Sequence, residues 1–184
     1  MDYPNVSILM PSYNRRKFLP LITYNLSNMD YDKSKLEWCI YDDGNLPLFT
    51  NETLSETREL LSPMKIVYKY DNKKRDIGVK RNMLVKMSKH KICIMMDDDD
   101  IYQSTYVKKS IDTMLEKNVK CVGSNQMIFY HQSKPDKRLT IIRCAAKRQI
   151  HEATMCFTKK YFNSMNGFKK NSQGEGVGLI DFND

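Results

Sequence analysis

Short apolar runs alternate with amphipathic segments over the first two thirds of the chain. Short runs rich in Val and Ile are typical of strands, and an apolar residue at every third or fourth position is typical of a helix. The pattern predicts strands at residues 6–10, 37–41, 65–70, 92–96 and 120–123, and helices at residues 16–29, 53–61, 79–88 and 104–118. Strands that alternate with helices predict an α/β fold with a mainly parallel central sheet flanked by helices.

The pattern changes after about residue 124. Apolar segments at residues 126–130 and 139–143 flank the polar stretch 131–138, which predicts an antiparallel hairpin. Residues 158–165 predict one more helix, and residues 169–184 are rich in glycine and weakly patterned. We therefore expect a small antiparallel hairpin beside the parallel sheet.

The length of 184 residues is that of one domain of typical size. We expect a single domain over residues 1–184, with a first half at 1–123 and a second half at 124–184. Because the sequence stops without a clear end signal, we also expect this domain to be the N-terminal part of a longer protein. Hydrophobic residues make up 41% and charged residues 28%, which is typical of a globular protein and excludes a disordered chain.

Charge and cysteine content bear on partners and location. Thirty Lys and Arg against 22 Asp and Glu give a formal net charge of +8, which favours nucleic acid, phosphates or an acidic membrane surface as partners. The longest apolar run, at residues 92–96, is far shorter than the roughly 20 residues of a transmembrane helix, so none is expected. The five cysteines form no CxxC pair. Free thiols are typical of a reducing compartment, so we expect a cytoplasmic protein.

The most distinctive feature is a run of four aspartates, Asp97, Asp98, Asp99 and Asp100, directly after the apolar run at residues 92–96. Adjacent carboxylates repel one another, and a divalent cation removes that cost because hard cations bind carboxylate oxygens. In an open α/β sheet the carboxyl ends of the strands line the ligand crevice. The position indicates a site for a metal ion and a phosphate group; the plainer interpretation is an exposed acidic loop before a helix.

A second acidic pair, Asp42 and Asp43, follows the strand predicted at residues 37–41. Asp is common in turns for backbone reasons alone, so a plain turn is the simpler interpretation. A second acidic strand end in the same sheet favours a shared site.

A basic belt covers residues 65–91, where ten Lys or Arg stand against two acids. In the helix predicted there, Val79, Met83 and Met87 lie on one face, so we expect most of the lysines to be solvated. Arg81 differs because it lies in the first turn of that helix, and a helix N-terminus favours anions.

Glu175 stands between two glycines, which allow close backbone approach and suit a carboxylate presented to a substrate. The alternative is a flexible terminal segment. His151 and Glu152 precede an apolar run and are weaker candidates.

Together these motifs resemble the nucleotide-diphosphate-sugar glycosyltransferases of the GT-A fold, family-2 type. The resemblance covers nearly the whole chain and rests on VSILMPSYNR at residues 6–15, IYDDG at 40–44, GVKRN at 78–82 and MDDDDIY at 96–102. Residues 157–168, followed by Gly174-Glu175, resemble the later acceptor-side signature. The short form rich in Lys, Asn and Met is similar to versions encoded by large DNA viruses, such as those of algae (chlorella viruses).

The resemblance implies a Rossmann-like nucleotide-binding fold and a role for each matched residue. Pro11, Tyr13 and Arg15 would line the nucleoside pocket, Asp43 would read the edge of the base (most often uracil), and Arg81 would stand near the base or the diphosphate. Asp98 would hold the ribose, and Asp99 would hold a manganese or magnesium ion with Asp97 in support.

The resemblance also implies that a carboxylate near Glu175 takes the proton from the acceptor hydroxyl. Many members have Glu-Asp at this point, whereas this chain has Glu175-Gly176, which leaves Asp181 as a reserve.

The expected function is inverting, metal-dependent transfer of a hexosyl or deoxyhexosyl group from a UDP-sugar to a hydroxyl group of a glycan or glycoprotein. A metal ion stabilises the departing diphosphate, and one positioned carboxylate with direct displacement implies inversion.

Three alternatives stay open. The missing acid at Gly176 allows a catalytically silent binder of sugar nucleotides. A nucleotidyltransferase is disfavoured because residues 11–15 contain no glycine. A nucleic-acid-binding module would fit the net charge and the Tyr68-Lys69-Tyr70 segment, but the aspartate run would repel a phosphate backbone, so we expect no nucleic acid partner.

Overall fold

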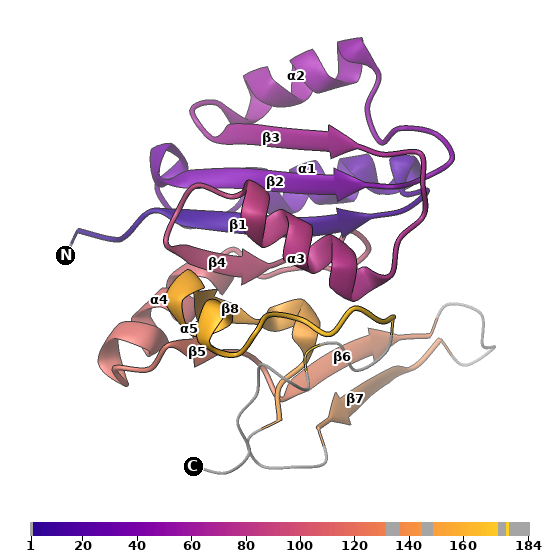
Figure 1. Ribbon diagram of the computed structural model, residues 1–184. Helices are drawn as coiled ribbons and strands as arrows, with labels where there is room; N and C mark the ends of the chain where they lie inside the picture. Colours follow the sequence, from indigo (N-terminus) through magenta and orange to yellow (C-terminus); the bar gives the residue numbers. More distant parts are fainter. Residues whose placement is uncertain (1, 132–136, 145–148, 173–175, 177–184) are drawn as a thin grey trace.

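A six-stranded sheet with helices on both faces forms the centre of the molecule (Figure 1). This computed structural model describes residues 2–131, 137–144, 149–172 and 176. The strand order is β3-β2-β1-β4-β8-β5. The strands are β1 (Val6–Ser12), β2 (Leu36–Asp42), β3 (Lys65–Tyr70), β4 (Ile92–Met95), β5 (Cys121–Val122) and β8 (Cys156–Thr158). A separate two-stranded sheet pairs β6 (Gln126–Tyr130) with β7 (Leu139–Arg143).

The first four strands of the central sheet are parallel, as predicted. β1 pairs in parallel with β2 and β4, and β2 pairs in parallel with β3. Every residue of β1 and β2 is buried, which is typical of parallel strands covered on both faces. The structure therefore confirms an α/β fold with a mainly parallel sheet and a small antiparallel hairpin.

The helices follow the predicted order. They are α1 (Leu19–Ser27), α2 (Asn51–Leu61), α3 (Ile77–Met87), α4 (Tyr106–Glu116) and α5 (Lys159–Ser164), with 3-10 turns η1 (Arg16–Phe18), η2 (Lys33–Lys35) and η3 (Glu152–Thr154). Helices α1, α4 and α5 are shorter than predicted, whereas α2 and α3 each begin two residues before the predicted start. The segment predicted as one helix at residues 16–29 divides into η1 and α1. Pro20 stands in the first turn of α1, where its missing N–H removes no helical hydrogen bond.

Alternate residues of the central strands face two separate parts of the core. Ile8 packs in a cluster that contains Leu26 of α1 and Ile111 of α4. Leu9 faces the other side of the sheet, in a cluster with Leu84 of α3. This alternation follows from the two-residue period of a strand, and it places α1 and α4 on one face and α3 on the other.

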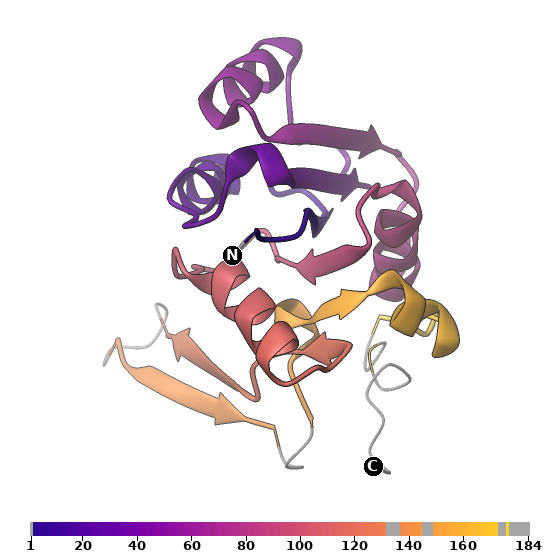
Figure 2. The ribbon, with the colours of Figure 1, turned by 90° about the vertical axis from the view of Figure 1, so that its left-hand side faces the viewer.

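Strand β8 is not predicted from the sequence. It is only three residues long and lies antiparallel between β4 and β5. Consequently β5, the strand predicted at residues 120–123, joins the sheet through β8 and not through β4. The hairpin predicted at residues 126–143 forms as expected, and Figure 2 shows it apart from the central sheet.

Candidate functional site

The carboxyl ends of β1, β2 and β4 lie at one edge of the sheet and bring distant segments together (Figure 1). Arg15, which follows β1, reaches the aspartate run that follows β4. Its Nε lies 3.2 Å from Oδ1 of Asp98, and its Nη2 lies 2.8 Å from Oδ2 of Asp99. The two strongest motifs of the sequence therefore share a site.

A cavity of about 280 Å³ opens at this edge of the sheet. Its lining consists of Pro11, Tyr13, Arg15, Ile77, Lys80, Asp97, Asp98 and Asp99. All except Ile77 and Lys80 are among the residues predicted from the sequence. The cavity thus presents carboxylates and cationic side chains to the same space.

The aspartate run is held in place by α1 and by Tyr102. The side-chain amide of Asn25 donates to the backbone oxygen of Asp100 at 2.9 Å and accepts from the backbone N–H of Tyr102 at 3.2 Å. The Tyr102 hydroxyl accepts from the backbone N–H of Asp97 at 2.8 Å and donates to the backbone oxygen of Ala153 at 3.2 Å. These bonds fix the loop that carries the carboxylates.

Burial makes the carboxylates of Asp97, Asp98 and Asp100 costly to ionise. It raises the pKa of Asp98 to about 6 against the opposing effects of the nearby Ser12 hydroxyl and of Arg15, and it raises the pKa of Asp100 to about 6. Burial also raises the pKa of Asp97, against the Arg81 guanidinium, whose Nη2 lies 3.4 Å from the carboxylate. Such a set of groups favours a bound cation.

The residues present fit a hard divalent metal ion. Oδ2 of Asp98 is buried and lacks a hydrogen-bond partner of normal geometry, and Asp99 is partly exposed at the cavity. Within the described ranges, no three His, Cys, Asp or Glu side chains surround one point. Magnesium-like ions do not require such a group, because they keep several waters and bind through one or two carboxylates plus substrate phosphates.

Asp42 and Asp43 have different surroundings. The Asp42 carboxylate accepts from the backbone N–H groups of Gly44 at 3.1 Å and Leu48 at 2.6 Å, and from the Tyr68 hydroxyl at 2.8 Å. Asp42 therefore stabilises the turn after β2, and the plain-turn interpretation holds for this residue.

Asp43 forms a buried ion pair with Lys80. Lys80 Nζ lies 2.8 Å from Oδ1 of Asp43, with 7% and 0% of the two side chains exposed. Oδ2 of Asp43 accepts from the backbone N–H of Arg75 at 2.6 Å, and Lys80 Nζ also donates to the backbone oxygen of Ser12 at 3.1 Å. Lys80 lines the cavity and Asp43 does not. The predicted contact of Asp43 with a base stays a prediction.

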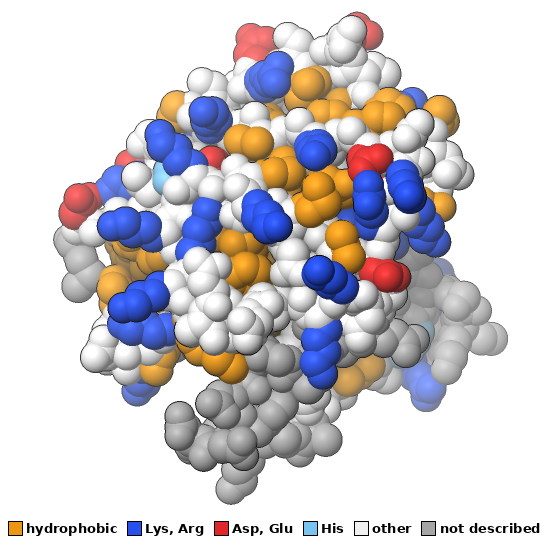
Figure 3. Space-filling model, in the orientation of Figure 1, with side chains coloured by type: hydrophobic (Ala, Val, Ile, Leu, Met, Phe, Trp, Pro, Cys, Tyr) orange, Lys and Arg blue, Asp and Glu red, His pale blue; other side chains and the backbone are white. Residues whose placement is uncertain are grey.

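Lys80 is the main residue that the sequence analysis missed. The face predicted for α3, with Val79, Met83 and Met87, is only half-buried. The buried residues of α3 are Gly78, Lys80, Arg81, Leu84 and Val85. Lys80 lies four residues before Leu84, and Arg81 lies four residues before Val85. Residues four apart share a helix face, so this spacing is a signal that the sequence contains. The other lysines of the belt are exposed, and Figure 3 shows Lys and Arg spread over the face that carries α3.

The turn after β2 packs directly against the turn after β1. Asn14 has a φ of 56°, and its Oδ1 accepts from the backbone N–H of Asn45 at 2.7 Å. A Cβ on Gly44 would lie 2.7 Å from the Asn14 backbone nitrogen. Glycine at this position therefore permits the approach that places Tyr13 and Arg15 at the cavity.

Glu175 and Asp181 lie outside the described residues. Gly176 is described, and a Cβ at this position would collide with Cγ of Glu152 and lie 3.1 Å from its Oε1. Glu152, in η3, also contributes to the raised pKa of Asp97, so its charge acts on the aspartate loop. At position 176 this chain therefore has a glycine packed against the acid Glu152.

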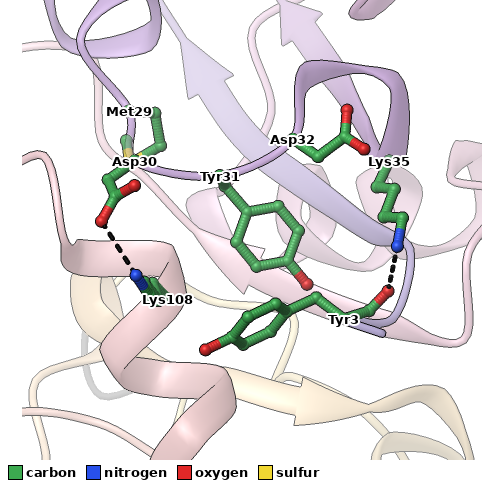
Figure 4. Close-up of a pocket in the computed structure, with 7 residues that line it drawn as sticks. All are labelled: Tyr3, Met29, Asp30, Tyr31, Asp32, Lys35 and Lys108. Carbon is green, nitrogen blue, oxygen red and sulfur yellow. Dashed lines mark hydrogen bonds and ion pairs between the residues drawn. The ribbon is translucent and has the colours of Figure 1, made fainter. Parts of the chain in front are cut away.

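A larger cavity of about 450 Å³ lies away from this edge (Figure 4). It is bounded by the N-terminal segment, by helix α4 and by the loop that follows α1. Its polar side chains already have partners. Lys108 pairs with Asp30 at 3.2 Å, the Tyr31 hydroxyl donates to the Pro4 backbone oxygen at 2.6 Å, and Lys35 donates to the Tyr3 backbone oxygen at 3.0 Å. Neither its position nor its contacts indicate chemistry.

The geometry and the sequence lead to the same family. The sequence profile of the family described as Glycosyl transferase family 2 matches residues 7–175, which span the cavity and both acidic turns. The chain belongs to glycosyltransferase family 2. Its fold is the GT-A fold expected from the sequence, as solved structures of similar architecture also show.

Two solved structures illustrate that similarity. The mannosyltransferase PcManGT from Pyrobaculum calidifontis, solved in complex with GDP-Man and Mn2+, superposes with a TM-score of 0.67 at 16% identity, over 92% of this chain and 49% of that chain. S. aureus TarS 1-349 in complex with UDP-GlcNAc superposes with a TM-score of 0.68 at 15% identity, over 95% and 52%. This chain therefore spans about half the length of these two solved chains. Within the part of the chain that the structure describes, no helix is long and apolar enough to cross a membrane.

Proposed function

We propose that this glycosyltransferase is metal-dependent and inverting, and that it moves a hexosyl or deoxyhexosyl group from a UDP-sugar to a hydroxyl group of a glycan or glycoprotein. The observation that carries the proposal is the cavity at the carboxyl edge of the sheet, where Asp98 and Asp99 stand beside Arg15 and Lys80. A sugar nucleotide with its metal ion combines a polyanion and a cation, so a donor site needs groups of both signs.

Asp99 would hold a manganese or magnesium ion, with Asp97 in support. When bound, such an ion neutralises the charge that develops on the departing diphosphate. The Arg15 guanidinium and the Lys80 ammonium are the cationic groups of the cavity, and both donate hydrogen bonds that suit diphosphate oxygens. The Mn2+ complex of the mannosyltransferase supports a metal ion in this fold.

The nucleoside would lie against Pro11 and Tyr13, with the ribose at Asp98. The Tyr13 ring is flanked by cations, with Lys74 Nζ 4.6 Å and Lys80 Nζ 5.8 Å from its centroid. Asp43, which forms the ion pair with Lys80, would read the base. Because the two solved structures carry GDP-Man and UDP-GlcNAc, uracil and guanine donors both belong in the test.

The acceptor proton would pass to Glu175, with Asp181 in reserve. The packing of Glu152 against Gly176 adds a third carboxylate on the acceptor side of the chain. In direct displacement the acceptor oxygen forms its bond to the anomeric carbon as the sugar–phosphate bond breaks, and the hydroxyl proton moves to the carboxylate. One such displacement inverts the anomeric centre.

The proposal is tested by incubating the full chain with UDP- and GDP-sugars and following donor loss and the anomeric proton by NMR. We expect Mn2+-dependent hydrolysis or transfer of one donor that stops with EDTA, and a first-formed product of inverted configuration. A retained configuration, or turnover unaffected by EDTA, would refute the corresponding part of the proposal.

Gly176 favours one second candidate, a catalytically silent binder of sugar nucleotides. That protein would bind the nucleotide and metal ion in the same cavity but turn over no donor. A cytoplasmic location, based on the five free cysteines, and a viral source, based on composition, stay predictions.

A further inference from the structure

The β6–β7 hairpin exposes large apolar side chains. In the cross-strand pairs Ile128–Ile141 and Tyr130–Leu139, the exposed fractions are 70% and 58%, and 53% and 66%. Alternate residues of a strand share a face, so these four side chains form one apolar patch on the hairpin. Contiguous exposed apolar side chains of this kind mark a site of interaction with a protein or a membrane.

Basic residues flank this apolar patch at both ends. Arg143 pairs with Gln126 on the same face at the base of the hairpin, and Lys137 lies two residues before Leu139 at its tip. Both side chains are exposed. Over residues 124–151 the chain has six Lys or Arg and one acid. An apolar surface between cations complements an anionic lipid surface, where apolar groups enter the interface and Lys or Arg bind headgroups.

A second copy of the chain fits this surface less well. In a two-fold contact the same patch meets itself, so the basic ends of the two hairpins would come together. The opposite face of the hairpin also exposes Phe129 and Ile142, with 40% and 45% of each residue accessible, and a flat contact on one face would leave them in water. A lipid interface surrounds an immersed ribbon on both faces.

We propose that the β6–β7 hairpin docks the protein on anionic membrane surfaces. Docking is peripheral, because the outer edges of a two-stranded ribbon carry unpaired backbone groups that cannot enter the hydrocarbon core. The base of the hairpin is tied to the candidate site: the His151 N–H donates to the Ser124 backbone oxygen, and Ala153 accepts from Tyr102 beside the aspartate run. A docked hairpin holds the cavity edge near the lipid. This inference does not depend on the proposed catalytic function.

The test measures binding of the full chain to vesicles by co-sedimentation. One set of vesicles is phosphatidylcholine alone, and the other contains about one third phosphatidylglycerol. The apolar variant is Ile128→Ser/Ile141→Ser, and its matched control is Leu60→Ser/Leu115→Ser, which changes side chains that are 56% and 50% exposed on α2 and α4. The charge variant is Lys137→Gln/Arg143→Gln, and its control of equal net charge is Lys86→Gln/Lys89→Gln.

We expect the wild-type chain to bind the anionic vesicles and not the neutral ones. The apolar variant should bind at least about tenfold more weakly, since it loses two aliphatic side chains that the lipid interface would bury. The charge variant should lose about fivefold per cation removed. Both controls should bind within about twofold of wild type.

Other outcomes overturn the inference. Equal loss in the Lys86→Gln/Lys89→Gln control would show general electrostatic attraction with no role for the hairpin. Absence of vesicle binding, together with a dimer in sedimentation equilibrium that Ile128→Ser/Ile141→Ser dissociates, would show that the hairpin contacts a second copy. Circular dichroism spectra of all variants should match wild type, which separates lost binding from lost folding.

Discussion

The ammonium group of Lys80 lies 2.8 Å from Oδ1 of Asp43, and this ion pair is buried beside the candidate donor cavity. Removing one member of such a pair leaves an uncompensated buried charge. We expect Lys80→Met alone to lower the free energy of unfolding by about 3–5 kcal/mol. The double variant Lys80→Met/Asp43→Asn should be less destabilised than the sum of the two single variants. Urea unfolding of all four proteins measures this coupling.

The same cycle separates structure from binding. If Lys80 also contacts the diphosphate, nucleotide affinity stays low in the double variant although stability partly returns. Additive losses of stability would contradict the buried pair, and full recovery of nucleotide affinity in the double variant would contradict a contact of Lys80 with the donor.

Arg15 pairs with Asp98 and Asp99 in the chain without metal ion. Arg15→Ala should therefore have opposite effects on two ligands. Affinity for Mn2+ alone should rise by up to about fivefold, because a competing cation at a partly exposed site is lost. Affinity for UDP in the presence of Mn2+ should fall, because a donor to the diphosphate is lost. Isothermal titration measures both.

Arg16→Ala is the matched control for Arg15→Ala. Arg16 donates to the backbone oxygen of Pro47 and forms no ion pair that the structure describes. It should change neither affinity. Changes of the same sign for Mn2+ and UDP in Arg15→Ala would contradict the assigned role.

Asp98 makes the stability of the metal-free chain depend on pH. Burial raises its pKa to about 6 in the folded chain, above 3.8 for an ordinary aspartate. The folded chain therefore binds the Asp98 proton more tightly than the unfolded chain, and ionised Asp98 destabilises the fold above about pH 6. Asp98→Asn removes this cost. The free energy of unfolding of Asp98→Asn minus that of wild type should therefore be larger at about pH 7.5 than at about pH 4, by on the order of 2 kcal/mol.

Urea unfolding of wild type and Asp98→Asn in EDTA measures that difference. Groups that lie far from Asp98 contribute equally to both proteins, so their effect on stability cancels in the comparison. A difference that stays constant with pH, or grows as the pH falls, would contradict the raised pKa.

Glu175→Gln tests the acceptor-side base. Loss of a general base lowers kcat by about 10²–10⁴-fold, while the KM for the donor and the affinity for UDP should stay near wild type. Glu152→Gln and Asp181→Asn, measured in parallel, show which of the three carboxylates accepts the proton. A kcat equal to that of wild type in all three variants would contradict a role for these carboxylates as the base. If, in addition, the wild-type rate does not exceed the rate at which the free donor hydrolyses, the result favours the catalytically silent binder.

Much of the fold is predictable because its strands are continuous apolar runs. β1, β2 and β4 need both faces buried, so their composition separates them from the helices without knowledge of the tertiary structure. Strand β8 lacks that signal, because its three residues gain their order from pairing with β4 and β5. Its antiparallel direction also depends on the path of the chain after β5, which no local pattern records.

The residues of the candidate site that directly follow a strand are predictable from the sequence. The residue that helix α3 contributes, Lys80, is not. Arg15 and Asp97–Asp99 lie after β1 and β4, and parallel strand ends meet by geometry. Lys80 belongs to the basic belt, for which the sequence predicts mostly solvated lysines, because Val79, Met83 and Met87 have the spacing of an apolar stripe on α3. The ion pair with Asp43 offsets the burial of its charge, and pairing across 37 residues of sequence leaves no local trace.

The most direct test of a metal-dependent donor site is isothermal titration of the full chain with UDP, and with GDP in parallel, in the presence of Mn2+ or EDTA. Asp99→Ala is the test variant, and Glu116→Ala, which removes an exposed acid of α4, is the control. We expect one nucleotide to bind wild type and Glu116→Ala only with Mn2+, and Asp99→Ala to lose that binding. Failure of both nucleotides to bind under either condition, or binding that Asp99→Ala leaves unchanged, would contradict the donor site.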